Sequence, residues 1–389
     1  MATRVYLDWN ATAPLRPEAR AAMLAAAETV GNPSSVHGAG RAARHLVETA
    51  RAQVAALVGA DPQDVIFTSG GTEANVLALD PTMESEERKG AIGRLLVSAI
   101  EHPSVRSGGR FPPNAMEDIP VTAIGIVDLT ALQQRLAVLV GKGIRPLVSV
   151  MLANNETGVI QPIRDVCRLV RAAAGFLHVD AVQVCGRIEI DFKELGSDLL
   201  TVSSHKLGGP MGVGALVKRA DLRLTPLITG GGQERHQRAG TENVPGIAGF
   251  GAAAAAVCAN LSMEASRMAA LRQELEAGIR RIAPDAVIFG ADSERLPNTT
   301  LFSVPGMKAE TAVIAFDLEG IAVSSGAACS SGKVSPSHVL AAMGVPQELA
   351  RGAVRVSLGF ATTEKDISAF LAAWAKLAGA LYKGRGIAA

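Results

Sequence analysis

Aromatic side chains are scarce in this sequence, at 4% of its 389 residues. Surfaces that bind single-stranded nucleic acid use aromatic rings to stack with bases, so the scarcity disfavours such a surface. The sequence also lacks an excess of charge, because 38 Lys and Arg residues nearly balance 37 Asp and Glu residues. The net charge of +1 gives no electrostatic reason to expect nucleic acid or an anionic membrane as a partner.

Cysteine is scarce as well. The four cysteines, at positions 167, 185, 258 and 329, lie far apart and lack the close spacing of metal sites. We therefore expect no metal ion, and reduced thiols as in a cytoplasmic protein. The N-terminus lacks the basic start and apolar core of a secretory signal. The longest run of small apolar residues, 246–259, is too short to span a bilayer. These absences predict a cytoplasmic protein without a membrane partner.

Hydrophobic residues, in contrast, make up 48% of the chain, and its length predicts about two domains. From about residue 50 to residue 220, short β-rich runs alternate with helical patterns. Such alternation favours an α/β fold whose mostly parallel sheet is covered on both faces. We expect strands of this sheet at residues 64–68, 94–98, 147–151, 176–180, 199–203 and 213–217, and strands of a smaller α+β unit at 297–304 and 353–358.

Ligands of parallel sheets collect at the carboxyl ends of the strands, where Asp180 and Ser203 stand. Lys206 follows Ser203 on a Gly-rich turn. A lysine within reach of an acid is what a protein needs to hold pyridoxal phosphate. The lysine forms a Schiff base with the aldehyde, and the acid keeps the pyridine nitrogen protonated. The alternatives are a helix N-cap for Asp180 and a surface loop for Lys206.

Three further loops follow expected strands. Gly71 and Thr72 open a helix and suit a phosphate cradle, although a Gly-Gly turn at this place is more often only a turn. His102 could stack on a cofactor ring or move protons, and taken alone it is more simply a loop histidine. The Asn155 amide could bond the phenolic oxygen of the cofactor, and an Asx turn explains it equally well.

Cys329 stands in the segment 324–333, whose other residues, apart from Lys333, are all Gly, Ala or Ser. Such a segment packs little, so we expect an exposed cysteine that can move, as suits a nucleophile. The other three cysteines have apolar neighbours and are expected in the core. On a later strand, Arg355 could bind a carboxylate with its planar fork, assisted by Asn32, or could be a salt-bridged strand residue.

The residues at 203–206 (Ser-Ser-His-Lys) and 324–329 (Ser-Ser-Gly-Ala-Ala-Cys) occur in an order and spacing that resemble those of one family. The chain is similar, from Leu7 to Gly359, to the NifS/IscS-type cysteine desulfurases. These are fold-type I pyridoxal phosphate enzymes of the class V aminotransferase family. The long loop after Ala327 favours this branch over the SufS-like one.

The resemblance implies a large domain with a mostly parallel seven-stranded sheet and a smaller domain. Residues 1–15 would join the small domain, residues 16–258 would form the large domain, and residues 259–389 would complete the small domain with the cysteine loop. The family also implies a homodimer.

The resemblance also implies a role for each site residue. Lys206 would carry the Schiff base, Asp180 would pair with the pyridine nitrogen, and His102 would stack on the ring. The substrate carboxylate would be bound by Arg355 and Asn32, near Asn155. Asn155 and Gln183 would bond the phenolic oxygen of the cofactor. The phosphate would be held by Thr72, Ser203 and His205, with Gly71 allowing close approach, and by Thr241 of the other subunit.

The implied activity is the conversion of L-cysteine to L-alanine. Lys206 would act as base at Cα, and Cys329 would take the sulfur as a persulfide. An acceptor, such as a scaffold for iron–sulfur cluster assembly, would then receive it. Close alternatives are a selenocysteine lyase and a class V aminotransferase. A non-catalytic scaffold of the same fold is a further alternative, although a scaffold needs neither Lys206 nor Cys329.

Overall fold

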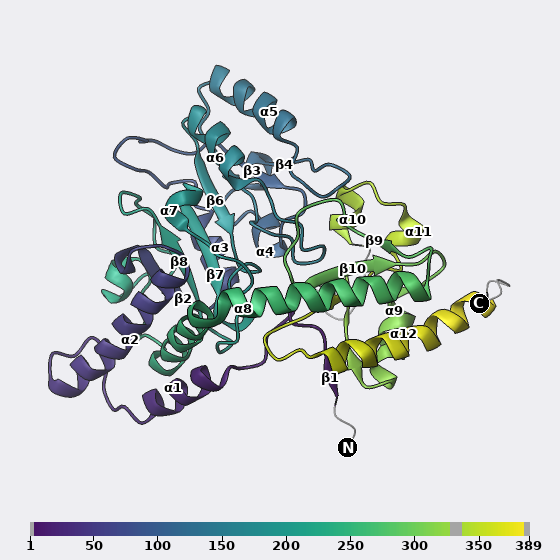
Figure 1. Ribbon diagram of the computed structural model, residues 1–389. Helices are drawn as coiled ribbons and strands as arrows, with labels where there is room; N and C mark the ends of the chain where they lie inside the picture. The colour runs from purple at the N-terminus through teal and green to yellow at the C-terminus, as the bar shows by residue number, and fades with distance from the viewer. Residues whose placement is uncertain (1–3, 327–336, 385–389) are drawn as a thin grey trace.

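The computed structural model describes residues 4–326 and 337–384. A seven-stranded sheet forms the centre of the larger part of the molecule (Figure 1). Except for the edge strand β4, its strands are buried along most of their length, as the apolar runs predicted. From one edge to the other they are β2 (Val65–Thr68), β8 (Gly214–Lys218), β7 (Leu199–Ser203), β6 (Phe176–Asp180), β5 (Pro146–Ser149), β3 (Arg94–Ser98) and β4 (Met116–Ile119).

Neighbouring strands from β7 to β4 are parallel, which confirms the predicted α/β class. β8 runs antiparallel to both β7 and β2, so β2 points the same way as β7. Gly214 at the start of β8 pairs with Thr68 on one side and with Ser203 on the other. The carboxyl ends of β2, β6 and β7 therefore lie on the same side of the sheet, and the site is formed there.

Successive residues of each strand enter different cores, because side chains alternate between the faces of a sheet. Leu199, for example, belongs to one hydrophobic cluster and Leu200 to the other. One face is covered by α3 (Gly71–Ala78) and α4 (Pro103–Arg106). The other face is covered by α1 (Pro17–Ala27), α2 (Gly38–Leu57), α5 (Leu129–Gly141), α6 (Ile163–Ala172), α7 (Phe192–Leu195) and the first half of α8 (Val244–Ile282).

The smaller part contains a four-stranded antiparallel sheet and a separate parallel pair. The sheet has the order β12 (Ser324–Ser325), β13 (Val354–Ser357), β10 (Thr299–Ser303) and β9 (Val287–Ile288). The pair joins the N-terminal β1 (Val5–Tyr6) to β11 (Ile321–Ala322). The helices of this part are α9 (Ala309–Leu318), α10 (His338–Ala342), α11 (Gln347–Ala350) and α12 (Glu364–Gly384).

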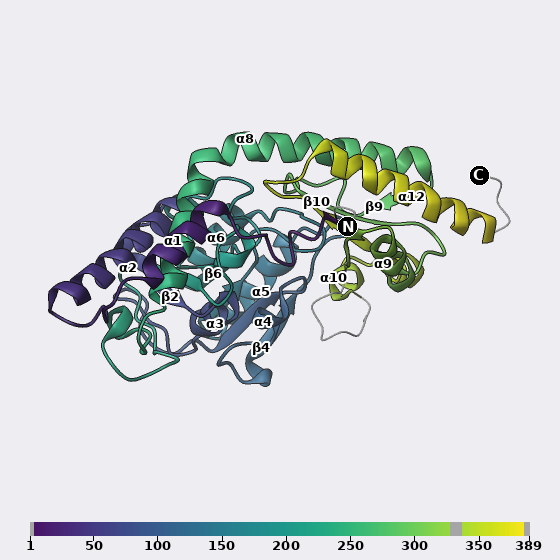
Figure 2. The same cartoon turned by 90° about the horizontal axis from the view of Figure 1, so that it is seen from below.

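The helix α8 is 39 residues long and runs along both parts, with α12 beside its second half (Figures 1 and 2). Phe250 and Val257 lie in the core of the large sheet, whereas Leu271 and Leu275 lie in the core of the smaller part. The apolar run 246–259 is thus part of a helix long and apolar enough to cross a membrane by length and composition alone. Burial against α1 and α2 accounts for most of the apolar residues of the run. Cys167 and Cys185 are buried as expected, whereas Cys258, near the end of this run, is exposed, so its predicted place in the core is wrong.

Candidate active site

The turn between β2 and α3 brings backbone N–H groups to the edge of the sheet. The first N–H groups of a helix have no partner within the helix and favour an anion. Gly71 lies close to its neighbours, since a Cβ there would sit 3.1 Å from Cγ2 of Val182 and 3.3 Å from Cβ of Ser203. Thr72 follows and is exposed. This arrangement can hold a phosphate group.

Asp180 ends β6 and is 5% exposed. Its Oδ2 accepts a hydrogen bond from Nδ2 of Asn75 at 2.9 Å, and its Oδ1 accepts one from the backbone N of Val182 at 2.9 Å. Hydrogen bonds to both oxygens fix the orientation of the carboxyl group in the cavity. Asn75 was not predicted. The available signal was its position three residues after Thr72, which places both on one face of α3.

Lys206 lies at the end of a short 3-10 turn (Ser204–Lys206) that follows β7. Its Nζ donates hydrogen bonds to the backbone oxygens of Asn10 at 2.6 Å and Ala11 at 2.8 Å. Asn10 O also accepts a hydrogen bond from Nε2 of Gln183 at 3.1 Å. The N-terminal segment thus contributes directly to the lysine's position, which the sequence spacing did not suggest.

His102 precedes α4 and is half-buried. Its Nδ1 lies 2.8 Å from Oγ of Ser104. Burial lowers the pKa of His102, and the positive charge of Lys206 lowers it further, while Asp180 acts in the opposite direction. The ring is therefore neutral near pH 7, which suits contact with an aromatic cofactor.

His205 is the second histidine of the site. Its Nδ1 lies 3.1 Å from Oγ1 of Thr12. Burial, together with the neighbouring Lys206, lowers the pKa of His205 to about 4. The neutral ring keeps one N–H available as a donor to an anion.

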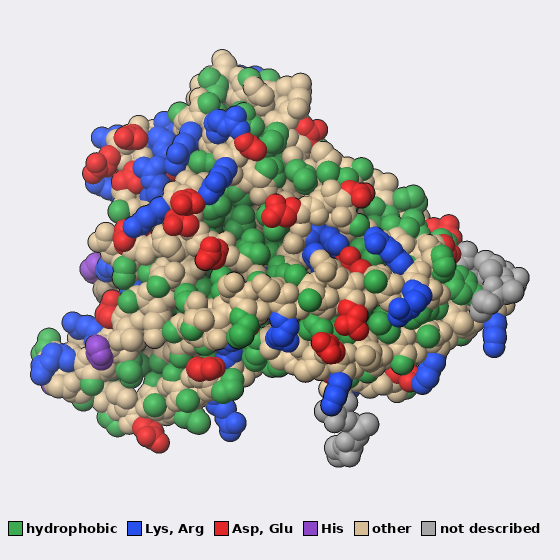
Figure 3. All heavy atoms as spheres, viewed as in Figure 1, with side chains coloured by type: hydrophobic (Ala, Val, Ile, Leu, Met, Phe, Trp, Pro, Cys, Tyr) green, Lys and Arg blue, Asp and Glu red, His purple; other side chains and the backbone are tan. Residues whose placement is uncertain are grey.

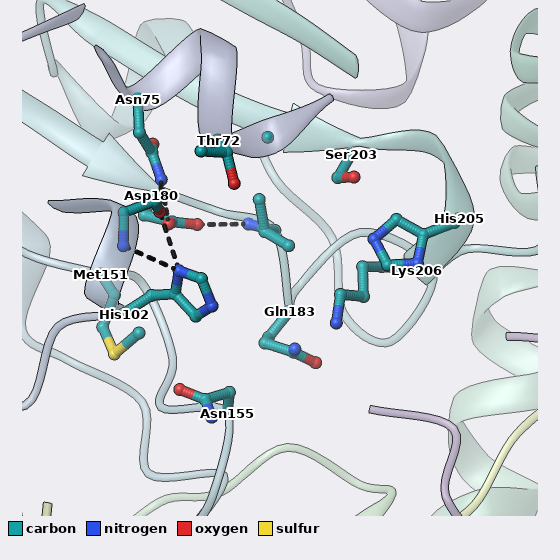
Figure 4. A pocket seen from close by; sticks show the side chains of 13 residues that line it. Thr72, Asn75, His102, Met151, Asn155, Asp180, Gln183, Ser203, His205 and Lys206 are labelled. Carbon is teal, nitrogen blue, oxygen red and sulfur yellow. Dashed lines mark hydrogen bonds between the residues drawn. The ribbon is translucent and has the colours of Figure 1, made fainter. Parts of the chain in front are cut away.

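The predicted cofactor residues, except Thr241, line one cavity of ≈ 250 Å³. Asp180 and His102 lie on one side of it and Lys206 with His205 on the other (Figure 4). The residues that line it are Gly71, Thr72, Asn75, His102, Ser104, Met151, Asn155, Asp180, Val182, Gln183, Ser203, His205 and Lys206.

Three other predicted residues lie elsewhere. Thr241 and Asn32 are exposed and do not line this cavity. Arg355 is buried behind it, where its Nη1 donates to the backbone O of Asn155 at 3.0 Å and its Nη2 donates to Oδ1 of Asp8 at 2.8 Å. Cys329 lies outside the described residues.

Comparison with known proteins agrees with the geometry. The family model described as Aminotransferase class-V matches residues 5–370. A cysteine desulfurase IscS of Dictyoglomus turgidum is 41% identical over 372 residues, which cover 95% of this chain and 93% of that protein. The solved NifS-like protein of Rickettsia africae has a TM-score of 0.86 and 37% identity, covering 98% of this chain and 100% of that one.

A further solved structure, SspA in complex with cysteine, is 28% identical with a TM-score of 0.77, covering 93% of this chain and 100% of that one. The chain therefore belongs to the class V aminotransferase family and, within it, to the cysteine desulfurases. The predicted resemblance is confirmed. The cofactor of this family is pyridoxal phosphate.

The cavity residues fit this cofactor. The buried carboxylate of Asp180 matches a ring nitrogen, the amine of Lys206 an aldehyde, and the start of α3 a phosphate. Oε1 of Gln183 is buried and accepts no hydrogen bond from a described residue, so it remains available to a bound group. When bound, the cofactor takes up the electron pair released at Cα of an amino acid substrate.

Proposed function

We propose that L-cysteine binds in this cavity and that its sulfur is transferred to Cys329. The Cys329 thiolate attacks the substrate sulfur, and the S–S bond forms as the Cβ–S bond breaks. The electron pair of the broken bond stays on carbon, which takes up a proton. The products are L-alanine and a persulfide on Cys329, so no external oxidant or reductant is needed.

The cavity residues support this chemistry. Lys206 is close enough to the other groups of the cavity to bind the aldehyde and then to move the proton at Cα. The Asp180 carboxyl group lines the same cavity, where it would pair with the ring nitrogen of the cofactor. The meeting of Lys206, Asp180 and neutral His102 around one cavity is the observation that carries the proposal.

Arg355 is proposed to bind the substrate carboxylate. Its Nε is buried without a partner among the described residues, and its Nη atoms reach Asn155 and Asp8. A guanidinium held in this way is oriented before a substrate arrives. Asn32 remains a predicted helper in this contact.

We also propose a homodimer in which Thr241 of one subunit reaches the phosphate of the other. The exposed position of Thr241 is compatible with this role.

The persulfide would pass to an acceptor protein such as an iron–sulfur scaffold. A cytoplasmic location agrees with the free thiols of Cys167, Cys185 and Cys258. On the face in Figure 3, basic and acidic side chains are intermixed.

Incubation of the cofactor-loaded enzyme with L-cysteine tests the proposal. We expect L-alanine to form together with a persulfide on Cys329. The Cys329→Ala variant should keep its bound cofactor and its yellow colour but should lose sulfide release. Full activity in that variant would contradict the mechanism. Turnover of L-selenocysteine, measured in parallel, separates a desulfurase from a selenocysteine lyase.

A further inference from the structure

Glu156 is a buried carboxyl group that the chemistry above does not use. It follows Asn155 in the loop after β5 and is 3% exposed. Its Oε2 accepts a hydrogen bond from Oγ of Ser337 at 2.5 Å. The same oxygen lies 3.1 Å from where a Cβ on Gly326 would stand. Glu156 is therefore hydrogen-bonded to the first described residue after the segment 327–336 and lies beside the last described residue before it.

Gly326 continues directly from β12. Ser324 pairs with Arg355 of β13, and the N of Gly326 donates a hydrogen bond to Ala353 O at 3.2 Å. A Cβ at position 326 would stand 3.1 Å from Oε2 of Glu156 and 3.4 Å from Cδ1 of Leu301, so the space at this position favours glycine. Cys329 comes three residues later, and three residues of extended chain span at most about 11 Å. The position of Gly326 therefore limits where the Cys329 thiol can reach.

Ser337 opens the helix α10 at the other end of the segment. Its Oγ accepts a hydrogen bond from the N of Leu340 at 3.1 Å while its proton goes to Glu156. The next residue, His338, places its Nε2 2.9 Å from the backbone O of Glu101. Glu101 directly precedes His102, and Glu156 directly follows Asn155. The start of α10 is thus attached to two loops that line the cavity.

Apolar contacts support the same attachment. Leu340 of α10 lies in one hydrophobic cluster with Ile100 and Met151, which come from the loops after β3 and β5. Met151 also lines the cavity. Because a buried carboxylate without a hydrogen-bond donor is costly, the contact of Glu156 with Ser337 favours one placement of the helix start.

We propose that Glu156 is a positioning residue for the sulfur-transfer step. By holding Ser337 beside Gly326 and against the cavity loops, it sets where the segment with Cys329 begins and ends relative to the cavity. This inference rests on the proposed role of Cys329. It assigns to Glu156 no contact with substrate or cofactor, so binding and proton movement at Cα should not depend on it.

The test compares two reactions of the cofactor-loaded enzyme. L-alanine formation from L-cysteine in a single turnover requires sulfur transfer. Exchange of the Cα hydrogen of L-alanine in deuterated water requires the cavity and Lys206 but no sulfur. For Glu156→Ala we expect sulfur transfer to slow about 10- to 100-fold, the effect of a misplacement of about 1 Å, with exchange unchanged. Glu156→Gln, which still accepts a hydrogen bond from Ser337, should restore most of the rate.

Glu276 provides a matched control in the smaller part. Its Oε1 accepts a hydrogen bond from Oγ1 of Thr300 at 2.9 Å, and its two carboxylate oxygens accept hydrogen bonds from Arg295. Glu276→Ala therefore removes a carboxylate that accepts a hydroxyl hydrogen bond but is bonded to neither Gly326 nor Ser337, and it should leave the ratio of the two rates unchanged. Should Glu156→Ala not fold, Ser337→Ala removes the donor instead and is expected to give the same split.

A parallel fall of both rates in Glu156→Ala, or an undiminished rate of sulfur transfer in that variant, would overturn the inference. Failure of the proposed function would look different. It would appear in an otherwise unchanged enzyme as L-alanine formation that survives Cys329→Ala.

Discussion

At the scale of single residues, the cavity holds Lys206 by the N-terminal segment. The Nζ atom lies within hydrogen-bond distance of the backbone oxygens of Asn10 and Ala11. Asn10 is itself fixed, because its Nδ2 donates to Thr299 Oγ1 at 2.9 Å and its Oδ1 accepts from Asn298 Nδ2 at 3.0 Å. The amine is therefore oriented toward the cavity by residues distant in sequence.

Lys206→Ala is predicted to lose the covalent link to the cofactor and all activity, because no other amine lines the cavity among the described residues. Borohydride treatment followed by peptide mass spectrometry measures this directly. Lys218→Ala is the control, since Lys218 is also buried and donates to Leu222 O at 2.8 Å, but on the far end of β8. A cofactor still fixed to the chain in Lys206→Ala would contradict the assignment.

Glu156 gives a pH-dependent prediction. Burial raises its pKa from 4.5 to about 7, while Ser337 and Arg355 oppose the rise. Because the pKa of Glu156 is higher in the folded state than in the unfolded state, its protonation stabilises the fold. This contribution to the free energy of unfolding is fully present below the unfolded-state pKa of 4.5 and is lost as pH rises through about 7. Glu156→Gln does not titrate. Its stability relative to the wild type should therefore increase over this range, by up to about 3 kcal/mol.

Thermal midpoints of both proteins at about pH 5 and about pH 8 check this sign. A difference between variant and wild type that is equal at the two pH values would show that Glu156 does not titrate in this way.

At the scale of elements, the sequence predicted those strands that are buried on both faces. The residues of β3, β6 and β7 were predicted with their observed bounds, since short, mostly apolar runs define them. β4 (Met116–Ile119) was missed because it lies at the sheet edge and only its last residue is buried. The boundary implied between residues 258 and 259 falls inside α8, because this one helix packs into the cores of both parts.

In the site, too, residues marked by a local sequence pattern were predictable, whereas contacts between residues distant in sequence were not. Gly71, Asp180 and Lys206 follow strands, so their meeting at one sheet edge was predictable. The pairing of Arg355 with Asp8 joins residues 347 positions apart and leaves no local pattern. Asn75 was overlooked for a different reason, since a buried amide in a helix resembles any other polar residue until its partner Asp180 is placed.

Gly71→Ala tests the role of the α3 N-terminus. Alanine favours the helix, so folding should not suffer. Its Cβ, however, would crowd Val182 and Ser203 at 3.1 and 3.3 Å and narrow the approach of a phosphate. We expect the affinity for pyridoxal phosphate to fall about tenfold, or about 1.4 kcal/mol, in a fluorescence titration. Gly141→Ala in α5, with nothing within 4 Å, is the control. Equal affinities in both variants would remove the phosphate role from this turn.

At the scale of the whole molecule, the site lies where the two parts meet. The large sheet contributes Asp180 and Lys206 to the cavity, and Arg355 of the smaller part donates a hydrogen bond to the backbone O of the cavity residue Asn155. A buried ion pair supports the junction, since Nη2 of Arg16 lies 2.6 Å from Oε2 of Glu264 in α8. Nε of Arg16 also donates to Leu207 O, next to Lys206, at 3.0 Å. We therefore assign the cofactor chemistry to the large sheet and the sulfur transfer to the smaller part, on opposite sides of one junction.

The central claim is that this junction moves sulfur from L-cysteine to Cys329. Its most direct test is the mass of the intact enzyme after a single turnover with L-cysteine, followed by mapping of the modified peptide. The account predicts one added sulfur atom on Cys329 and one L-alanine per active site. Added sulfur on another cysteine, or L-alanine formed at the same rate by Cys329→Ala, would contradict it.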